Sequence, residues 1–229
     1  MMSLILPYWN RNAATNEAMW LIGKHYAALD LEVLVVDDGS HEEFVPAGEW
    51  PFLRVIKLPR KDVAMNPCVP INAGVREARG DILILSNPEV KHHTPVLQEM
   101  RDELERTGQL GYVLAACKYD RDQTWHCHSS LVNEQGYRDQ YRQPKGSGFH
   151  FCAMLYRTLW DKAGGFDEDY REGSHYDDPD WVNRVARAGG IFRMRDDLVV
   201  EHTRTGAEAN YASGMQERNK ALFFDKWPQ

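Results

Sequence analysis

The sequence predicts a single α/β domain with a mostly parallel central sheet flanked by helices. Short apolar segments rich in Val, Ile and Leu alternate with segments of helical periodicity, which is the order expected of βα units. The apolar segments scarcely alternate with polar residues, as is typical of parallel strands covered on both faces. A chain of 229 residues with 43% hydrophobic content is long enough to bury one substantial core.

Local patterns place the elements along the chain. The expected strands lie at 3–6, 31–36, 54–58, 81–85, 112–117, 151–156, 191–194 and 198–202. The expected helices lie at about 15–28, 95–107, 157–163 and 179–188, with a last helix near the end of the chain. In the helix at about 95–107, Thr94 fits the N-cap, Pro95 the first turn and Gly108 the end.

Composition disfavours several classes of function. The formal net charge is −7 and the pI is about 5.7, so the chain is expected to repel nucleic acid and anionic membranes. The sequence has no run of about 18 apolar residues, and its apolar start breaks at Pro7, so neither a membrane span nor a signal peptide is predicted. Four scattered cysteines are typical of reduced thiols. These features predict a soluble cytoplasmic protein.

A first candidate site follows the strand at 31–36, which runs into Asp37, Asp38 and a Gly-Ser turn. Ligands of open α/β sheets bind beyond the carboxyl ends of strands, where this order places both carboxylates. There they can accept hydrogen bonds from a uracil or thymine imide or from ribose hydroxyls. An ordinary Asp-Gly turn explains the same residues.

A second candidate site follows the strand at 81–85, which delivers Asn87 and Glu89 to the same edge of the sheet. Oxygen ligands at alternate positions suit a hard divalent cation such as Mg²⁺ or Mn²⁺, which would also hold phosphates. A turn ended by Pro88 is the simpler explanation. Near the end of the chain, His202 also follows an apolar strand; its ring nitrogen can complete a metal shell, or the residue is structural.

A third candidate site is the acidic segment around Asp177, Asp178 and Asp180, which opens a predicted helix. One of these carboxylates can serve as a general base at a substrate hydroxyl. Asp178 followed by Pro179 is equally typical of an N-cap with proline at the first helical position. The two interpretations are compatible, because a cap at the edge of a cleft can also face a substrate.

Taken together, the segments SLILPYWNR, VVDDGS, NAG with ARGD, SNPEV, GGFDE, YDDPDW with Arg184, and EHT resemble family 2 of the inverting glycosyltransferases over nearly the whole chain. The resemblance implies a GT-A nucleotide-diphospho-sugar transferase fold in one domain. We expect a nucleotide-binding half at about 1–118, an acceptor and catalytic half at about 119–204, and a C-terminal helical tail at about 205–229.

The resemblance also implies roles for particular residues. On the donor side we expect Pro7, Tyr8, Asp37, Asp38, Asn72 and Asn87. Glu89 and His202 are the expected metal ligands, and Asp178 is the expected base. On the acceptor side we expect Asp177, Gly148 and His150.

Two departures from the family pattern affect these expectations. Asn87 and Glu89 stand in SNPEV, which is similar to an Asn-Pro-Asp variant of the metal-binding Asp-x-Asp motif, so metal dependence is open. Asp177 replaces the usual glutamate of an acidic pair and leaves the base position, Asp178, unaltered. The SNPEV variant slightly favours a UDP- or dTDP-sugar as donor. The sequence does not identify the hydroxyl acceptor: a glycan, a lipid, a protein, a small molecule and a modified nucleobase all stay open, although the acidic charge disfavours a nucleic acid.

Three alternatives differ in chemistry. An NAD-dependent dehydrogenase shares the βα order, but the turn at 7–12 contains no glycine where the dinucleotide fingerprint needs three. A non-catalytic nucleotide-sugar-binding module keeps the fold without turnover. A zinc module would use His126, Cys127 and His128 with His92 and His93, although adjacent residues on a strand point to opposite faces. Arg138, Arg142 and Lys145 suit closure over phosphates, an acidic acceptor or a solvated face.

Overall fold

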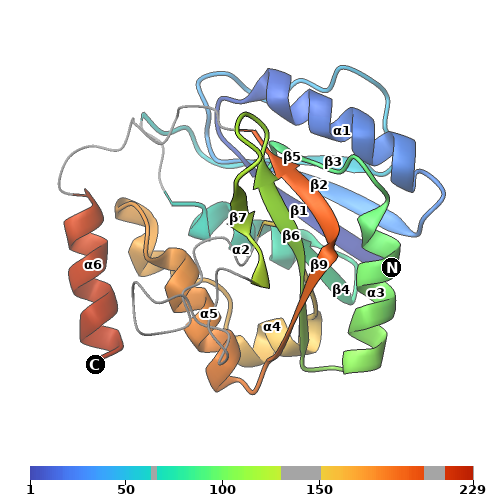
Figure 1. Ribbon diagram of the computed structural model, residues 1–229. Coiled ribbons are helices and arrows are strands. Elements are labelled where there is room, and N and C mark those ends of the chain that lie inside the picture. The colour runs from blue at the N-terminus through green and yellow to red at the C-terminus, as the bar shows by residue number, and fades with distance from the viewer. Residues whose placement is uncertain (63–65, 130–150, 204–214, 229) are drawn as a thin grey trace.

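The computed structural model describes residues 1–62, 66–129, 151–203 and 215–228 (Figure 1). The strands are β1 (Met2–Tyr8), β2 (Leu31–Asp37), β3 (Leu53–Lys57), β4 (Ile82–Leu85), β5 (Val90–Lys91), β6 (Gly111–Tyr119), β7 (Trp125–Cys127), β8 (Ala153–Tyr156) and β9 (Ile191–His202). The helices are α1 (Asn12–Tyr26), α2 (Cys68–Glu77), α3 (Val96–Thr107), α4 (Arg157–Ala163), α5 (Asp177–Arg187) and α6 (Met215–Lys226), with a 3₁₀ helix η2 (Glu168–Glu172) before α5.

The sheet is parallel in one half and mixed in the other. Its order is β3-β2-β1-β4-β8-β6-β9-β5, with β7 paired to β6. The pairs among β3, β2, β1 and β4 are all parallel, as predicted. Beyond β4, only β6 and β9 run parallel, and β8, β7 and β5 pair antiparallel. The prediction of a mostly parallel sheet therefore holds for the first half alone, because the antiparallel pairs join strands whose partners a local pattern does not reveal.

Helices cover both faces of the sheet. Along β1, Leu4 and Leu6 pack with α1 and α3, whereas Ile5 packs on the other face with α2, α4, α5 and α6. Val33 and Leu34 divide in the same way along β2. Successive side chains of a strand point to opposite faces, so a strand covered on both sides is apolar at every position. This explains the unbroken apolar runs in the sequence.

The strand and helix ends differ from prediction in a few places. The segments predicted at 191–194 and 198–202 form one strand, β9, whose register with β6 shifts between Ala115 and Ala116. The prediction that Thr94 caps α3 is wrong by one position, because Pro95 is the N-cap residue. The backbone N–H of Val96 instead donates to the hydroxyl of Tyr26 at 3.1 Å, so a residue of α1 satisfies the start of α3.

Helix α2 was not predicted, although its NAG motif was noted. It begins at Cys68 and has Pro70 in its first turn. The N–H groups of a first turn have no partner within the helix, so a proline there costs no hydrogen bond. Gly74 faces the sheet, and a Cβ there would lie 2.7 Å from the side chain of Ile5 and 3.0 Å from that of Val36. The glycine therefore lets α2 approach β1 and β2 closely.

The four cysteines are buried and unbridged, as the sequence predicted. Of the helices formed by the described residues, none has the length and apolar character needed to cross a membrane.

Candidate functional site

The carboxyl ends of β1 and β2 lie side by side, and Asp37 and Asp38 follow there. Tyr8 of β1 is in register with Asp37, and the N–H of Asp38 donates to the carbonyl of Tyr8 at 3.0 Å. The carboxylate of Asp37 accepts from the N–H groups of Ser40 at 2.9 Å and Phe44 at 3.2 Å. The Asp37 carboxylate therefore stabilises the turn that follows β2, in agreement with the interpretation of this segment as an Asp-Gly turn. The predicted contact of Asp37 with the donor stays a prediction.

Asp38 is buried and forms an ion pair. Lys61 Nζ lies 2.5 Å from its Oδ1. Burial raises the pKa of Asp38 above its ordinary value, although the hydrogen bond and the charge of Lys61 act in the opposite direction. Gly39 follows with φ at +79°, and a Cβ there would lie 2.1 Å from the carbonyl oxygen of Pro59. This turn therefore requires glycine.

Pro7 and Tyr8 lie at the end of β1. The pairing of β1 with β4 ends at Ile5. Pro7 has no backbone N–H, and no residue of β4 needs a hydrogen bond from it. The Tyr8 side chain is 1% exposed, and its hydroxyl donates to the carbonyl of Glu42 at 2.8 Å. Burial raises the pKa of Tyr8 to about 12. Sequence reasoning missed the next residue, Trp9, a half-exposed ring 6.0 Å from the ring of His41.

Glu89 and His202 meet because β5 pairs antiparallel with the end of β9, with Val90 opposite His202. Glu89 Oε1 lies 3.3 Å from His202 Nε2, and both side chains are buried. Asn87 Nδ2 also lies 3.3 Å from that ring nitrogen. Asn87 and Glu89 of the SNPEV segment therefore lie beside His202, which the resemblance paired with Glu89. The two-residue strand β5, which is too short to recognise by pattern, brings them together.

Arg11, in the turn after β1, forms an ion pair with the same oxygen of Glu89. Burial alone would raise the pKa of Glu89, but the hydrogen bond to His202 and the charge of Arg11 hold it below its usual value. Sequence analysis did not assign Arg11, although a cation directly after the first strand was visible in PYWNR. This contact joins the ends of β1 and β4.

Glu89, His202 and Asn87 carry atoms of the kinds that ligate a divalent cation, and Arg11 is paired with Glu89 Oε1. Within residues 1–62, 66–129, 151–203 and 215–228, no group of three His, Cys, Asp or Glu side chains is placed to hold a metal. An amide oxygen is also a ligand for Mg²⁺ or Mn²⁺, so Asn87 can supply a third group. In the same ranges, the buried Glu89 Oε2 and His202 Nδ1 have no hydrogen-bond partner.

The histidines of the zinc alternative are only partly assembled. His126 lies beside His202, with ring centres 5.7 Å apart. His92 instead contacts the hydroxyl of Tyr26 at 2.8 Å, and burial lowers its pKa to about 3. His93 pairs with Glu201 at 3.1 Å. His92 and His93 therefore contact other residues and do not join His126 in the cluster that a zinc module would need.

The acidic segment begins α5 two residues earlier than predicted. Tyr176 occupies the N-cap position, so the prediction of Asp178 as N-cap is wrong, and Pro179 lies at the third helical position. A proline is tolerated there because N–H groups of the first turn have no partner within the helix. Asp177 is buried and Asp178 is half-buried. Burial raises the pKa of the Cys68 thiol at the start of α2, and the nearby carboxylates of Asp177 and Asp178 raise it further.

Asp180 is fully engaged within the fold. It is 1% exposed and accepts hydrogen bonds from Arg184 Nε at 2.7 Å, Trp227 Nε1 at 2.9 Å and the Tyr170 hydroxyl at 3.3 Å. Arg184 also contacts Asp167 at 2.8 Å. This part of the acidic motif therefore holds α5, α6 and η2 together.

Asn72, predicted on the donor side, contacts the GGFDE segment. Its Nδ2 donates to the carbonyl of Phe166 at 2.9 Å and to Glu168 at 3.0 Å, and its Oδ1 accepts from the N–H of Phe166 at 3.0 Å. Gly148, His150 and the cations Arg138, Arg142 and Lys145 lie outside the described residues.

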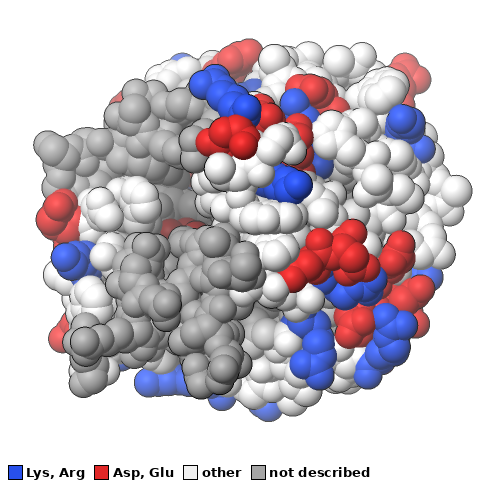
Figure 2. All heavy atoms as spheres, in the orientation of Figure 1, with Lys and Arg blue, Asp and Glu red and all other residues white. Residues whose placement is uncertain are grey.

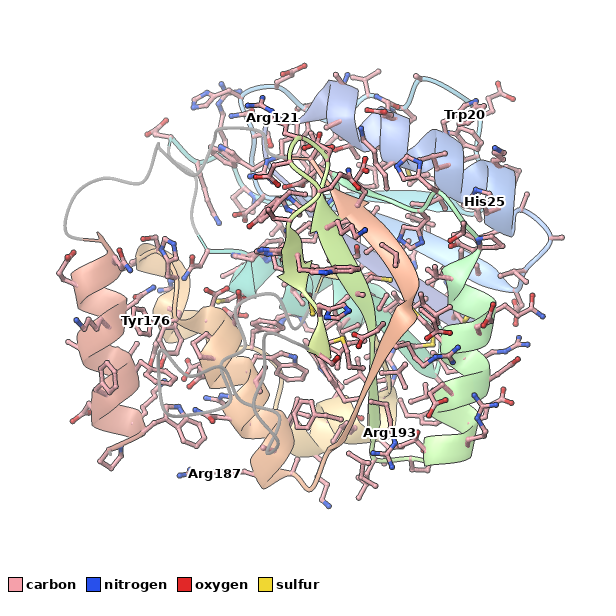
Figure 3. The ribbon with its side chains drawn as sticks, viewed as in Figure 1. Trp20, His25, Arg121, Tyr176, Arg187 and Arg193 are labelled. Carbon is pink, nitrogen blue, oxygen red and sulfur yellow. The ribbon has the colours of Figure 1, made fainter. Side chains whose placement is uncertain are left out.

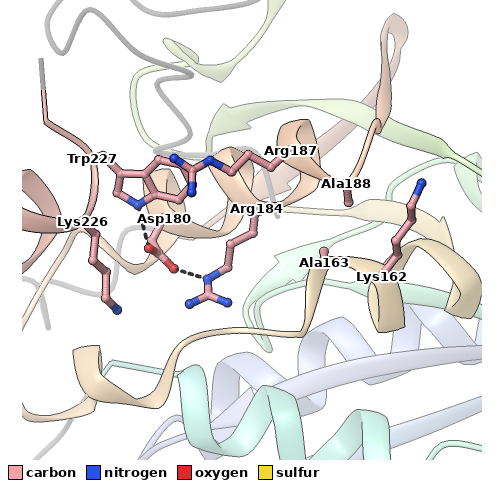
Figure 4. Close-up of a pocket in the computed structure, with 8 residues that line it drawn as sticks. All are labelled: Lys162, Ala163, Asp180, Arg184, Arg187, Ala188, Lys226 and Trp227. Carbon is pink, nitrogen blue, oxygen red and sulfur yellow. Dashed lines mark hydrogen bonds and ion pairs between the residues drawn. The ribbon is translucent and has the colours of Figure 1, made fainter.

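A cavity of about 500 Å³ lies between α4, α5 and α6 (Figure 4). It is lined by Lys162, Ala163, Asp180, Arg184, Arg187, Ala188, Lys226 and Trp227. Arg187 lies over the ring of Trp227 at 3.9 Å. Asp180 of the acidic segment is among these eight, whereas the predicted base, Asp178, and the predicted donor and metal residues are not.

Charges are mixed on the face of the molecule that Figure 2 presents. Over α3 and β9, Arg195 lies 2.7 Å from Asp197, 3.2 Å from Glu99 and 3.7 Å from Glu103. Acidic neighbours therefore offset the positive charge of Arg195, so this part of the surface does not favour binding of a nucleic-acid backbone.

Comparison with known proteins decides the family. Residues 3–164, well over half of the chain, match the model of a protein family described as glycosyl transferase family 2. The chain belongs to glycosyl transferase family 2. The match contains the ends of β1, β2 and β4, whereas Asp178 and His202 of this glycosyltransferase lie beyond it.

Individual relatives are distant. The glycosyltransferase is 20% identical over 133 residues to a dolichol-phosphate mannosyltransferase of Pyrococcus furiosus, a match that covers 58% of this chain and 38% of the relative. It is similar in structure to TarS of S. aureus, with a TM-score of 0.67 at 14% identity over 98% of this chain and 43% of TarS. The mannosyltransferase PcManGT of Pyrobaculum calidifontis, solved with GDP-Man and Mn²⁺, gives a TM-score of 0.63 at 16% identity over 99% of this chain and 70% of its own.

These similarities establish a GT-A fold for the chain. The chain spans less than half the length of the dolichol-phosphate mannosyltransferase and of TarS.

Proposed function

We propose that this glycosyltransferase inverts configuration as it moves a sugar from a nucleoside diphosphate to an acceptor hydroxyl, with Asp178 as general base. One observation carries the choice of base. Of the three carboxylates in the first turn of α5, Asp177 and Asp180 are 5% and 1% exposed, whereas Asp178 is half-buried. A base must reach solvent or substrate, so Asp178 is the carboxylate best placed for proton transfer.

The reaction requires one proton transfer and one substitution. The Asp178 carboxylate accepts the proton of the acceptor hydroxyl while that oxygen attacks the anomeric carbon. The bond from this carbon to the diphosphate breaks on the opposite face, and the nucleoside diphosphate leaves with the electron pair. Attack opposite the leaving group inverts the configuration.

The buried donor set around Glu89 supports a divalent cation, Mn²⁺ or Mg²⁺, held by Glu89, His202 and Asn87. When bound, the cation would act as a Lewis acid that offsets the negative charge on the diphosphate. Arg11 contacts Glu89 Oε1, and the second oxygen of Glu89 has no hydrogen-bond partner among the described residues. We propose that Arg11 places a positive charge beside the leaving diphosphate.

The donor is proposed by class. The variant SNPEV favours UDP- or dTDP-sugars, and the Mn²⁺ and GDP-Man bound to the structural relative PcManGT add GDP-mannose as a candidate. The half-exposed Trp9, with its ring 6.0 Å from His41, offers an aromatic surface near Asp37 and Asp38 for a nucleobase.

The first test is Asp178→Asn, assayed by release of nucleoside diphosphate from UDP-glucose, dTDP-rhamnose and GDP-mannose, with a panel of hydroxyl acceptors. We expect kcat to fall at least about a hundredfold, because asparagine cannot accept the proton. Stability should fall by no more than about 1 kcal/mol, the contribution of one carboxylate near a helix N-terminus. Asp225→Asn, at an exposed position of α6, is the matched control. Near-normal turnover of Asp178→Asn would exclude Asp178 as the base.

The second test separates metal from donor binding. Titration calorimetry with UDP, dTDP and GDP, each in Mn²⁺ and in EDTA, should show tighter binding with the metal for at least one nucleotide. A saturating ligand at about 100 times its Kd stabilises the native state by about 2.7 kcal/mol, so a thermal shift should accompany binding. Glu89→Gln should remove most of the difference between Mn²⁺ and EDTA.

Three outcomes would contradict parts of this proposal. Equal losses of affinity for Glu89→Gln in Mn²⁺ and in EDTA would show that Glu89 is not a metal ligand. Tight donor binding without turnover on any acceptor would favour a non-catalytic module. Stabilisation by NAD and by no nucleoside diphosphate would contradict the proposed donor class.

A further inference from the structure

The turn that leads into α5 has an uncommon backbone conformation. His175 and Tyr176 both lie in the left-handed region, with φ at 62° and 68°. This region is unfavourable for residues with a Cβ, and the surrounding structure must stabilise two such residues in succession. Asp177 and Asp178 follow directly, so the conformation of this turn sets the position of both carboxylates.

Two asparagines from distant parts of the chain bind the same two carbonyl groups of this segment. Asn66, just before α2, donates to the carbonyls of Tyr170 at 3.2 Å and His175 at 3.1 Å. Asn219, in α6, donates to the same two carbonyls at 3.0 and 3.1 Å. Each amide group supplies N–H donors to both carbonyls, and the Tyr170 carbonyl also accepts from the backbone N–H of Gly173 at 3.2 Å. We call this arrangement the asparagine clamp.

The asparagine clamp is buried and closely fitted. Asn66 is 3% exposed and Asn219 is 0% exposed. The Asn219 side chain lies where residue 173 has no Cβ: a Cβ on Gly173 would come within 2.2 Å of it. Arg218 donates to Asn219 Oδ1 at 2.9 Å, so the amide oxygen is satisfied as well.

Helix α6 and the residue that follows it contact the chain on both sides of the two carboxylates. Figure 3 shows Tyr176 between α6 and α5, and its ring centre lies 5.5 Å from that of Phe223. On the far side, Trp227 donates to Asp180 at 2.9 Å. Phe223 is fully buried in the core shared by α2, α4 and α5. Helix α6 therefore packs against the residue directly before Asp177, whereas Trp227, which follows α6, contacts Asp180 and not the turn.

We infer that the asparagine clamp positions Asp178 for proton transfer, and that α6 is thereby a functional part of the site. This inference rests on the proposed role of Asp178. Asn66 and Asn219 are positioning residues, because their amides bind backbone carbonyls. Either asparagine alone still binds both carbonyls, so removal of one should loosen the turn and leave the fold intact. A catalytic group displaced by about 1 Å loses up to about a hundredfold in rate.

The test compares Asn219→Ala with Trp227→Phe. Both variants remove hydrogen bonds of α6, but Trp227→Phe leaves the asparagine clamp complete. For the sugar nucleotide that the wild type turns over best among UDP-glucose, dTDP-rhamnose and GDP-mannose, kcat of Asn219→Ala should fall about ten- to a hundredfold. The Kd of that donor should change less than about threefold, and Trp227→Phe should keep kcat within about threefold of wild type. Amide hydrogen exchange should accelerate at residues 174–180 in Asn219→Ala and not in Trp227→Phe.

A double variant distinguishes positioning from general destabilisation. In the Asp178→Asn background, Asn219→Ala should lower the residual kcat by less than about twofold, because the group that it positions is already gone. Should Asn219→Ala not fold, Asn66→Ala removes the amide on the α2 side and should lower kcat in the same way.

Three results would overturn the inference. Wild-type kcat in the folded asparagine variants, with Asp178→Asn inactive, would refute the asparagine clamp and leave the proposed base in place. Normal kcat in Asp178→Asn would refute the proposed base itself and the inference with it. An equal loss of kcat from Asn219→Ala in both backgrounds would assign Asn219 a structural role only.

Discussion

Asp38 and Asp180 are buried carboxylates of two candidate sites, yet the two halves of the molecule hold them differently. Asp38 follows β2, its backbone N–H donates to the carbonyl of Tyr8 in β1, and its carboxylate forms an ion pair with Lys61. Asp180 receives hydrogen bonds from Arg184, Trp227 and Tyr170 on three elements. In the parallel half, strand order alone brings acidic groups to one edge. In the helical half, their position depends on side chains from distant segments.

The largest expected effect on stability comes from breaking the hydrogen-bond network around Asp180 in the helical half. Asp180→Ala leaves the partly buried Arg184 without its closest carboxylate and frees the indole N–H of Trp227. Removal of one partner from a buried charged network destabilises by about 3–5 kcal/mol. Urea unfolding should measure this loss. Asp225→Ala, at an exposed position of α6, should stay within about 0.5 kcal/mol of wild type, and a similarly small loss for Asp180→Ala would show that the network does not stabilise this half.

A smaller effect is expected in the parallel half, where α2 lies close against the sheet. Gly74→Ala gains helix propensity of about 1 kcal/mol but places a Cβ 2.7 Å from Ile5. Overpacking of a core costs about 1–3 kcal/mol, so we expect a net loss of stability. Arg76→Ala, at an exposed position of the same helix, should change the free energy of unfolding by less than about 0.5 kcal/mol. A gain in stability for Gly74→Ala would show that α2 can move away from β1.

The smallest effect concerns the opposite end of the parallel strands and depends on pH. Burial alone would raise the pKa of Glu32, but hydrogen bonds from Ser3, the backbone of Arg79 and the Arg54 side chain lower it below its usual value. A lowered pKa in the folded state stabilises the protein above the unfolded pKa of about 4.3, and this stability is lost as pH falls further.

Glu32→Gln should therefore lose about 1–2 kcal/mol at pH 7, the contribution of hydrogen bonds to a charged group, and less at pH 3. Thermal unfolding of both proteins between pH 3 and pH 7 measures the difference. A loss that stays constant across this range would show that the charge of Glu32 does not contribute.

The parts of the fold that were predictable are those encoded by local pattern. The apolar runs at β1, β2, β4 and β6, and the positive-φ glycines at the ends of α3 and α4, depend on near neighbours in sequence. Strand β5 has two residues and no period to detect. The order of strands in the mixed half of the sheet depends on which distant segments pair, and no sequence motif predicts that pairing.

The candidate site likewise has parts that local sequence patterns predicted and parts that depend on distant contacts. Asn87 and Glu89 were predicted from one motif and His202 from another segment, and the three lie together. Arg11, which pairs with Glu89, was missed because a lone arginine in a turn has no local signature. The predicted cap at Asp178 was wrong because the N-cap residue, Tyr176, lies in the left-handed region, a conformation that side-chain preferences for helix starts do not indicate. Asn66 and Asn219 lie in unrelated motifs, so the asparagine clamp was not visible in the sequence.

The asparagine clamp has a consequence for the order in which the protein matures during synthesis. Asn66 is made before the turn that it binds, whereas Asn219 follows residue 176 by 43 positions. At a translation rate of about 5–20 residues per second, that interval lasts roughly two to nine seconds. The last strand, β9, ends at His202 and is synthesised within it. Until residue 219 has been made, only Asn66 is available to hold the turn before Asp178, so this turn reaches its full set of hydrogen bonds only after the last strand has been synthesised.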